Sequence, residues 1–325
     1  MRVTVTRGNL LCASDCAASE RLPTLCISAM SFPRCPATAS PLPMMLGRVT
    51  LLVLLASACA TSAPIQPPTT GPGPTRTAAG QQAGAPIRAL YITGGGFHDF
   101  VALQQIVPPG IAARTNIVWT IDRTADTSTT ALIARHRTTA WADSFDVVVY
   151  NMSFSWVVDP QWIERIAHAH RDKGVAAVIL HGAVHSYRRS TSTAWKEMMG
   201  ASSMRHDAQR VYGLERVTPD HPIIRALPKG WTPGRDELYE IQRVWPGMVP
   251  LAQSWSVETE KHQPVTWTNM WGKARVFVTP MGHNIHTMSD PAYLDLVTRG
   301  LLWTLGKLEA DGTPAAGYGP KSAAP

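Results

Sequence analysis

The sequence predicts an α/β domain whose mainly parallel sheet is covered by helices on both faces. Three observations lead to this prediction. The strand-like segments are nearly continuous apolar runs, as expected of strands that are buried on both faces. A helix with clear start and stop signals lies between two of these runs, and an amphipathic helix closes the domain. Strands that alternate with helices favour a parallel sheet wound on both sides.

Four short apolar runs predict the parallel strands. The first is followed by three glycines in a row, and the fourth ends at the dipeptide His181-Gly182. A buried strand that stops at a tight turn is typical of α/β folds with a site at the strand end. The four runs cover residues 87–93, 116–122, 145–152 and 175–181.

Two Asp-Pro pairs predict where the main helices begin. In the segment 159–174, Asp159 can cap a helix, Pro160 suits its first turn, and Gly174 suits its end. The segment 289–308 repeats the Asp-Pro start. Its apolar residues fall on one face of a helix, as expected for a helix that covers a sheet: Leu294, Val297, Leu301 and Leu305.

The stretch 209–283 has a different pattern. It holds several short strand-like segments, such as "VPLAQSW" and "QPVTWTN", with few helical segments between them. We therefore expect antiparallel additions to the sheet in this stretch.

Residues 44–59 have the layout of a secretion signal. Arg48 precedes an apolar run that starts at Val49, and small residues lead to Cys59. This ending resembles a bacterial lipoprotein signal. It predicts a lipid on Cys59 and export to the bacterial cell envelope, with the lipid as the only contact with the membrane. The alternatives are an ordinary cleaved signal and an uncleaved anchor, although a comfortable membrane span takes about 20 residues.

Composition divides the rest of the chain. Signals normally open a protein, so translation is expected to start at one of the two methionines that begin the signal. Residues 1–43 are then a start-site artefact or an unstructured segment. Residues 60–86 and 309–325 are rich in small residues and proline, which predicts a linker and an unstructured tail. One domain over 87–308 remains.

The positions of the cysteines exclude several kinds of site. All five cysteines lie at or before Cys59, so the predicted domain has no disulfide, no zinc–thiolate cluster and no cysteine nucleophile. The formal net charge is +7, but the arginines are scattered and are not interleaved with aromatic residues. We therefore predict no nucleic-acid partner.

Polar residues stand where the predicted strands end. His98 follows the first strand, Asn151 ends the third, His181 ends the fourth with His185 close behind, and His283 follows the last strand. Ligands of doubly wound sheets bind at the carboxyl ends of the strands. Three histidines at such ends predict a histidine-rich site there.

The predicted domain resembles the ThuA-like (trehalose utilisation) family. The resemblance covers 87–308, and it rests on the order and spacing of several segments more than on any one of them. These segments are "ALYITGGGFHD", "GVAAVILHGAVHSY", "WKEMMGASSMRH", "TPDHPIIRALP", "DELY", "QPVTWTNMWGKARVFVTPMGH" and "RGLLWTLG".

The resemblance implies a flavodoxin-like sheet of the class I glutamine amidotransferase-like type, and a role in sugar metabolism. The position that holds the cysteine nucleophile in true amidotransferases is similar to His181 here, which excludes glutamine hydrolysis through a thiol ester. The suggested substrate is a sugar, as a keto-glycoside or a disaccharide.

The resemblance also carries a set of polar positions over to this chain. Asp236 and Glu237 are adjacent at a strand start, so their side chains point to opposite faces, and Glu237 is the better candidate to face the site. The matching positions are His98, His181, His206, Asp236, Glu237 and His283.

Further residues are candidates for binding a substrate. Asp99 could orient the ring of His98, and Asn151 and His185 stand near the same strand ends. Tyr187 and Trp267 could stack on a sugar ring, with packing in the core as the alternative.

Two chemistries fit these residues, and a third possibility is binding without chemistry. His98, His181 and His283 could hold a divalent, zinc-like metal, with Glu237 as a further ligand. Alternatively, histidines and Glu237 act as general acid and base without a metal. The non-enzymatic alternative is a sugar-binding surface lipoprotein whose histidines only donate hydrogen bonds to the ligand.

Overall fold

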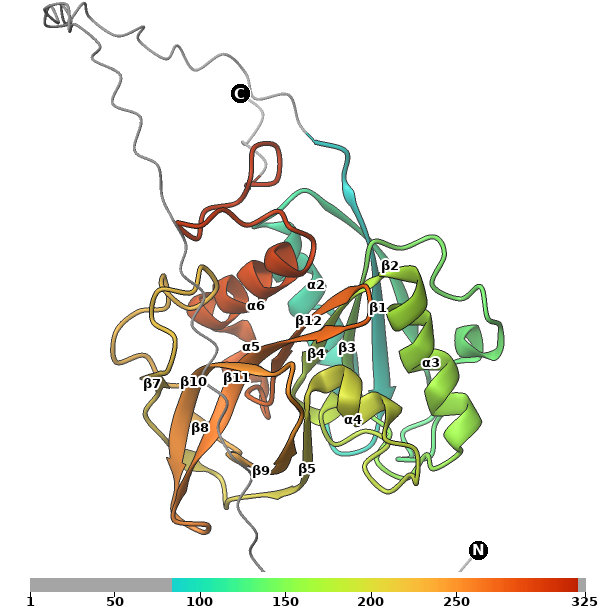
Figure 1. Cartoon of the computed structure of the whole chain (residues 1–325), viewed down its shortest axis with the longest axis horizontal. Helices are drawn as coiled ribbons and strands as arrows, with labels where there is room; N and C mark the ends of the chain where they lie inside the picture. Colours follow the sequence, from blue (N-terminus) through green and yellow to red (C-terminus); the bar gives the residue numbers. More distant parts are fainter. Residues whose placement is uncertain (1–83, 321–325) are drawn as a thin grey trace, which may run out of the picture. The chain divides into compact units, whose positions relative to one another are not determined.

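The computed structural model describes residues 84–320, and its centre is an eight-stranded sheet in the order β2-β1-β3-β4-β12-β11-β10-β7 (Figure 1). The predictions for residues 1–59, including the lipid on Cys59, and most of the predicted linker lie outside the described residues. Five neighbouring strands are parallel: β2 (Ile117–Arg123), β1 (Ile87–Gly95), β3 (Val147–Ser153), β4 (Ala176–Leu180) and β12 (Ala274–Thr279).

The order of these parallel strands confirms the flavodoxin-like prediction. Counted along the chain, the five strands lie in the order 2-1-3-4-5, which is the flavodoxin order. Every residue of β3 and of β4 is buried, which explains why both segments are continuous apolar runs.

The antiparallel additions predicted for 209–283 are also present. Next to β12, three strands continue the sheet in antiparallel pairs: β11 (Lys261–Trp271), β10 (Val249–Ser256) and β7 (Glu215–Arg216). Two small antiparallel sheets lie apart from it. They are formed by β5 (Ala201–His206) with β9 (Tyr239–Val244), and by β6 (Arg210–Val211) with β8 (Arg235–Asp236).

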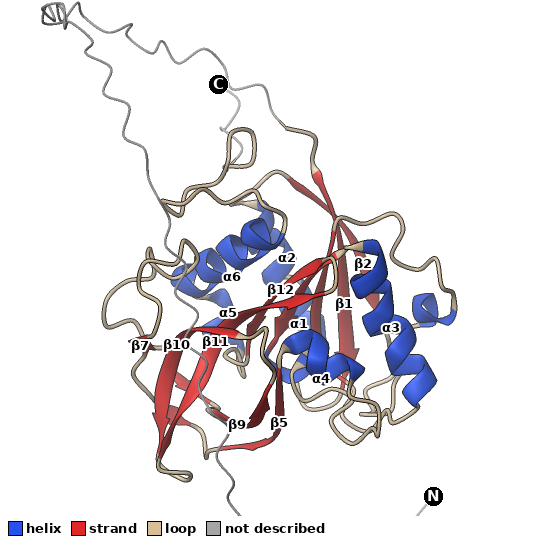
Figure 2. Ribbon diagram, in the orientation of Figure 1, coloured by secondary structure: helices blue, strands red, loops and turns tan. Residues whose placement is uncertain are grey.

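Helices cover both faces of the sheet (Figure 2). One face packs against α3 (Pro160–Lys173) and α4 (Ala194–Met199), and the other against α2 (Val107–Ala112) and α6 (Pro291–Thr304). Shorter helical segments are α1 (Phe100–Gln104), α5 (Ile285–Ser289) and two 3-10 turns, Ala134–Arg137 and His181–Ala183.

The start of each long helix is fixed by the residue that the sequence predicted. The Asp159 side chain accepts a hydrogen bond from the backbone N–H of Gln161, and Gly174 ends α3 with a left-handed φ of 77°. The Asp290 side chain likewise accepts from the first turn of α6. Both helices therefore begin at an Asp-Pro pair, as predicted.

The described part of the C-terminal tail differs from its prediction. The backbone N–H of Glu309 donates to the carbonyl of Thr313 (2.8 Å), and the Thr115 hydroxyl donates to the carbonyl of Tyr318 (2.7 Å). The Lys307 ammonium lies 3.8 Å from the centre of the Tyr318 ring. The prediction of an unstructured tail is therefore wrong for 309–320, because a local turn and one aromatic residue attach this segment to the domain.

Among the residues that the structure describes, none of the helices has the length and apolar composition needed to cross a membrane.

Candidate functional site

The three histidines at the strand ends meet in the folded chain. The ring centre of His98 lies 4.8 Å from that of His181 and 5.2 Å from that of His283, and the last two are 5.4 Å apart. One ring nitrogen of each lies within 4.8 Å of the other two. Loops after β1, β4 and β12 supply the three rings, so this cluster depends on the parallel order of the sheet.

His181 stands at a strained turn. Its backbone φ is +40°, a left-handed conformation that side chains other than glycine rarely adopt. The adjacent position, Gly182, leaves little room for a side chain. A Cβ atom on Gly182 would lie 3.0 Å from the carbonyl of Met152 and 3.3 Å from Nε2 of His98. The missing side chain thus lets the His98 ring approach the turn.

The ring of His181 is held in one tautomer. Its Nδ1 lies 2.7 Å from the carbonyl oxygen of Pro280, and because a carbonyl only accepts, Nδ1 carries the proton. Nε2 then keeps its lone pair. It is buried without a hydrogen-bond partner and lies 3.6 Å from Oε2 of Glu237. Metal-binding histidines commonly donate their other N–H to a backbone carbonyl in this way.

Of the two adjacent acidic residues, Glu237 faces the cluster. The Asp236 carboxylate is fully buried and accepts hydrogen bonds from the backbone N–H groups of Gly282 (2.8 Å) and His283 (3.0 Å). It therefore ties the end of β8 to the loop after β12. Glu237 Oε1 lies 3.1 Å from Nδ1 of His283 and 3.4 Å from Nε2 of His206.

His283 and His206 approach Glu237 from two sides. Nε2 of His283 accepts a hydrogen bond from the Gln209 amide (2.8 Å). Its Nδ1 is close to Glu237 but lacks the in-line geometry of a hydrogen bond, and it is buried without a partner. Nδ1 of His206 donates to the carbonyl of Asp207 (2.8 Å), and its Nε2 is the ring nitrogen that faces Glu237.

Burial lowers the pKa of two of the three clustered histidines, whereas the contact with Glu237 raises the pKa of His283. Burial, with repulsion from the other two histidines, lowers the pKa of His98 to about 3. Burial also lowers the pKa of His181 to about 4, against the attraction of Glu237. For Glu237, burial alone raises the pKa, but the close approach of the His283 Nδ1–H group and attraction to the neighbouring histidine rings lower it to about 2. Two neutral imidazoles thus lie beside an ionised carboxylate.

These donors fit a divalent metal ion. Neutral imidazole nitrogens and a carboxylate are the ligand types of catalytic zinc sites. Nε2 of His181 has a free lone pair, is buried and has no hydrogen-bond partner, and Oε2 of Glu237 lies 3.6 Å away as a further ligand. At His283 the lone pair is on Nε2, where a metal ion would take the place of the Gln209 amide.

A second group of carboxylates is already paired with cations. Oxygen atoms of Asp207, Glu240 and Glu258 lie within 4.8 Å of one another. However, Arg205 Nε lies 2.7 Å from Glu240 and Arg210 Nη2 lies 3.4 Å from Asp207. We therefore assign no metal to this group.

The histidine cluster borders a cavity of about 340 Å³. This volume is at the lower end of the range for small-molecule sites, which runs from about 300 to 1,000 Å³. A larger, open hollow of about 690 Å³ lies beside β2, but the histidine cluster does not line it. Five of the predicted residues line the smaller cavity: His98, His185, His206, Glu237 and His283.

His181 lies behind the wall of this cavity. It is 1% exposed, and its neighbour Gly182 forms the wall. Between the two roles that the sequence left open, ligand and proton carrier, this burial favours the ligand. His185, by contrast, lines the cavity. Its ring stacks on Tyr239 with the ring centres 3.8 Å apart, and its Nε2 forms a hydrogen bond with the Ser203 hydroxyl.

Five other residues that were predicted to bind the substrate do not reach the cavity: Asp99, Asn151, Tyr187, Asp236 and Trp267. Asp99 does not orient His98, because its side chain caps α1 by accepting from the N–H of Ala102. Asn151 is buried and its amide donates to the Tyr91 hydroxyl (2.8 Å). A position near a strand end does not reveal that a side chain caps a helix or bonds a neighbouring strand, so the sequence did not predict these contacts.

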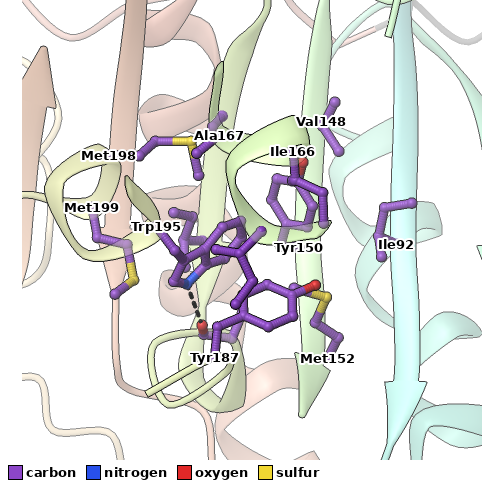
Figure 3. Close-up of a cluster of buried hydrophobic side chains, with 14 of the residues drawn as sticks. Ile92, Val148, Tyr150, Met152, Ile166, Ala167, Tyr187, Trp195, Met198 and Met199 are labelled. Atoms are coloured by element: carbon purple, nitrogen blue, oxygen red, sulfur yellow. Dashed lines mark hydrogen bonds between the residues drawn. The ribbon is translucent and has the colours of Figure 1, made fainter. Parts of the chain in front are cut away.

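The two aromatic candidates pack in the core, which corrects their prediction as sugar-stacking residues. Tyr187 is 1% exposed and lies against Trp195 (Figure 3). Trp267 is fully buried, and its indole N–H donates to the carbonyl of Met199 (2.7 Å). An apolar segment does not show whether an aromatic side chain faces the core or a ligand.

Several residues of the cavity were not identified from the sequence. Phe97, Ser155, Arg188 and Tyr239 line it, and the Phe97 side chain is 76% exposed with a left-handed φ of 76°. The position of Phe97, between three glycines and His98, could have indicated that it lies at the site. The sequence gave no such indication for Arg188, because its segment has no periodic pattern.

Comparisons with known proteins agree with this fold. A ThuA-like protein from Parabacteroides merdae shares 18% identity, with 71% of this chain and 98% of that chain covered and a TM-score of 0.54. A ThuA-like protein from Bacteroides uniformis shares 15% identity, with 72% and 97% covered and a TM-score of 0.53. A glutamine amidotransferase from Thermotoga maritima is more distant, with 12% identity, 61% and 76% covered and a TM-score of 0.40. For the two ThuA-like proteins, the likeness at such identities shows a shared fold.

Among curated proteins, none matches this sequence. The family model ThuA, described as trehalose utilisation, matches residues 107–304, which is more than half of the chain. The match includes the strands and loops that supply His181, His206, Glu237 and His283. The chain therefore belongs to the ThuA (trehalose utilisation) family.

Proposed function

We propose that the protein is a carbohydrate-processing enzyme that acts on a keto-glycoside or keto-disaccharide in the cavity beside His98, His206, Glu237 and His283. The observation that carries this proposal is the convergence of three strand-end histidines within 4.8 Å, next to the ionised carboxylate of Glu237. Membership of a family described as trehalose utilisation supports a sugar as the substrate.

His98, His181 and His283 would hold a divalent metal, with Glu237 as a further ligand. When bound, the metal would polarise a carbonyl or a pair of hydroxyl groups of the sugar. The Pro280 carbonyl fixes the His181 ring, and the Asp236 carboxylate holds the backbone of His283, so the donor atoms are in place before a ligand arrives.

His206 is the residue of this chain that is best placed to move a proton. Its side chain lines the cavity and is 36% exposed, and Nδ1 is held by the Asp207 carbonyl, so Nε2 is the ring nitrogen that would accept a proton. It would remove the proton from the carbon next to the keto group, and the electrons of the C–H bond would form the enolate.

The enolate would then expel the glycosidic oxygen from the adjacent carbon. The C–O bond breaks with its electron pair on the oxygen, and this oxygen takes the proton back from His206. The products are an unsaturated keto-sugar and a free alcohol, and no other reactant is consumed. Phe97, exposed at the cavity, offers an aromatic face for the sugar ring.

The test is turnover of a 3-keto-disaccharide, with the unoxidised disaccharide as a matched substrate, by the purified full-length protein. We expect release of the free sugar from the keto compound only, and a loss of about 10²- to 10⁴-fold in rate for His206→Gln. His221→Gln is the control, because His221 packs against Trp303 outside the cluster. Binding of the keto compound without turnover would support the alternative of a sugar-binding protein.

Metal analysis of the same preparations separates the two chemistries. Retention of about one zinc ion per chain after dialysis, and its loss in His98→Ala, would support the metal-dependent version. Full turnover of metal-free protein would contradict it and leave general acid–base catalysis.

The export of the protein is a further part of this proposal. A lipid on Cys59 would place the enzyme at the cell envelope, joined to the anchor by the segment 60–86. Support for this comes from the sequence of residues 44–59.

A further inference from the structure

Arg188 is a cation in the cavity without an acidic partner. One guanidinium nitrogen, Nη1, donates to the carbonyl of Met204 (2.7 Å), which fixes the side chain. The Nε–H group is buried and has no hydrogen-bond partner. Arg188 takes part in none of the ion pairs found among residues 84–320, while Arg205 and Arg210 each contact a carboxylate.

Ser155 presents a second unused donor at the same cavity. It is 1% exposed, lines the cavity, and its hydroxyl has no hydrogen-bond partner. The backbone N–H of Tyr187 donates to the carbonyl of Phe154 (3.1 Å). Ser155 comes directly after Phe154 in the chain, and Arg188 comes directly after Tyr187. This hydrogen bond therefore brings the backbones of Ser155 and Arg188 side by side.

Unpaired donors of this kind destabilise the folded chain. Burial lowers the pKa of Arg188, because a partly buried charge is less well solvated than an exposed one. A buried donor without a partner loses its hydrogen bond to water and gains none in return. A ligand that brings anionic oxygen atoms would satisfy both Arg188 Nε–H and the Ser155 hydroxyl.

We propose that Arg188 and Ser155 form a subsite for an anionic group, a carboxylate or a phosphate, carried by the sugar. This inference rests on the proposed function and narrows it, because it assigns the substrate to the acidic sugars. A neutral hydroxyl could also accept these hydrogen bonds, but an anionic oxygen adds the attraction between opposite charges, and the guanidinium matches the geometry of carboxylate and phosphate groups.

The experiment is calorimetric titration of the purified full-length protein with glucuronate, glucose 6-phosphate and glucose. We expect at least one acidic sugar to bind about 10- to 100-fold more tightly than glucose, as one or two charge-assisted hydrogen bonds predict. The acidic sugar that binds more tightly identifies the anionic group as a carboxylate or a phosphate.

Substitutions test whether Arg188 and Ser155 cause the preference for acidic sugars. Arg188→Met keeps the length of the side chain and removes its charge, and it should reduce the preference to about twofold or less. Arg189→Met is the matched control, since Arg189 is exposed and its guanidinium lies 3.9 Å from the centre of the Trp156 ring; it should keep the preference. Ser155→Ala removes only the unpartnered hydroxyl, and we expect it to fold and to weaken acidic-sugar binding severalfold.

The outcomes separate this inference from the proposed function. Equal binding of glucose and both acidic sugars would overturn the subsite and leave the proposed function standing. A preference that survives in both Arg188→Met and Ser155→Ala would also overturn it; if Arg188→Met fails to fold, Ser155→Ala alone decides. If none of the three sugars binds and the keto-disaccharide is not turned over, both proposals fail.

Discussion

At the scale of single residues, His181 combines two features that destabilise the folded chain. Its left-handed backbone costs about 1–3 kcal/mol, and its buried, unpartnered Nε2 costs a similar amount. Both occur at the end of β4, beside two other histidines. Strain of this kind persists where function requires it, which supports a role for His181 as a ligand.

A second buried histidine, His136, allows a direct test of unpartnered ring nitrogens. It is fully buried against Trp141, and neither ring nitrogen has a hydrogen-bond partner. We expect His136→Leu to raise the free energy of unfolding by about 1–3 kcal/mol, because it removes two unsatisfied polar atoms. Urea denaturation measures this change.

The matched control is His170→Leu. His170 is equally buried, but its two ring nitrogens bond the Tyr150 hydroxyl (2.7 Å) and the Val175 carbonyl (2.6 Å). This variant should lower the free energy of unfolding, because it leaves both partners unpaired. If both variants destabilise the protein equally, hydrogen bonding does not explain the difference between the two sites.

At the scale of secondary-structure elements, the site is assembled by connections between strands. The sequence predicted β1, β3, β4 and α3 because apolar runs and capping residues are local signals. It also placed histidines at strand ends, since parallel strands share one edge. It could not place Arg188 and Ser155 in the cavity, because that depends on the contact between the loops after β3 and β4.

Asp236 is a positioning residue that links β8 to the loop after β12. Its two carboxylate oxygens accept from three backbone N–H groups, those of Glu237, Gly282 and His283. Asp236→Asn keeps the shape but replaces one acceptor oxygen by a donor. We expect metal affinity to fall by about 10- to 100-fold, as for other residues that hold a ligand in place.

A metal titration of Asp236→Asn measures this effect. Asp172→Asn is the control, because Asp172 forms only an exposed ion pair with Arg171. Unchanged metal affinity in Asp236→Asn would show that the loop after β12 holds its position without this carboxylate.

At the scale of the whole molecule, the buried histidines make stability depend on pH. Burial, with repulsion from His170, Arg135 and Arg165, lowers the pKa of His136 to about 3. Burial lowers the pKa of His170 to about 4, although the Val175 carbonyl opposes this. The cavity lined by histidines lies at the strand ends of the flavodoxin-like sheet, and most of its lining residues belong to the part of the chain that matches the family. Unfolding of this part of the chain therefore also removes the site.

The sign of the pH effect follows from these lowered pKa values. From about pH 6.5 down to about pH 4 for His170, and to about pH 3 for His136, the unfolded chain binds a proton at the histidine and the folded chain does not, so stability falls as the pH falls. Each such histidine contributes up to about 1.4 kcal/mol per pH unit. Urea denaturation at pH 7 and pH 5 should show lower stability at pH 5, and His136→Leu should reduce the difference.

The export proposal concerns the N-terminal residues, which lie outside the described part of the chain. Cys59→Ser should release the protein from the membrane fraction of cells, because the lipid is the proposed anchor. Thr69→Ala, in the segment 60–86, is the control and should remain in the membrane fraction. If Cys59→Ser stays with the membranes, the apolar run from Val49 acts as an uncleaved anchor.

The central claim is that the strand-end histidine cluster is the working site of a carbohydrate-processing enzyme. Its most direct test is the initial rate on a 3-keto-disaccharide for the wild type, His181→Ala and His221→Ala. His181→Ala removes a buried ring nitrogen beside Glu237 and should reduce the rate by at least about 10²-fold, while His221→Ala keeps it. A folded His181→Ala variant with the wild-type rate would contradict the account.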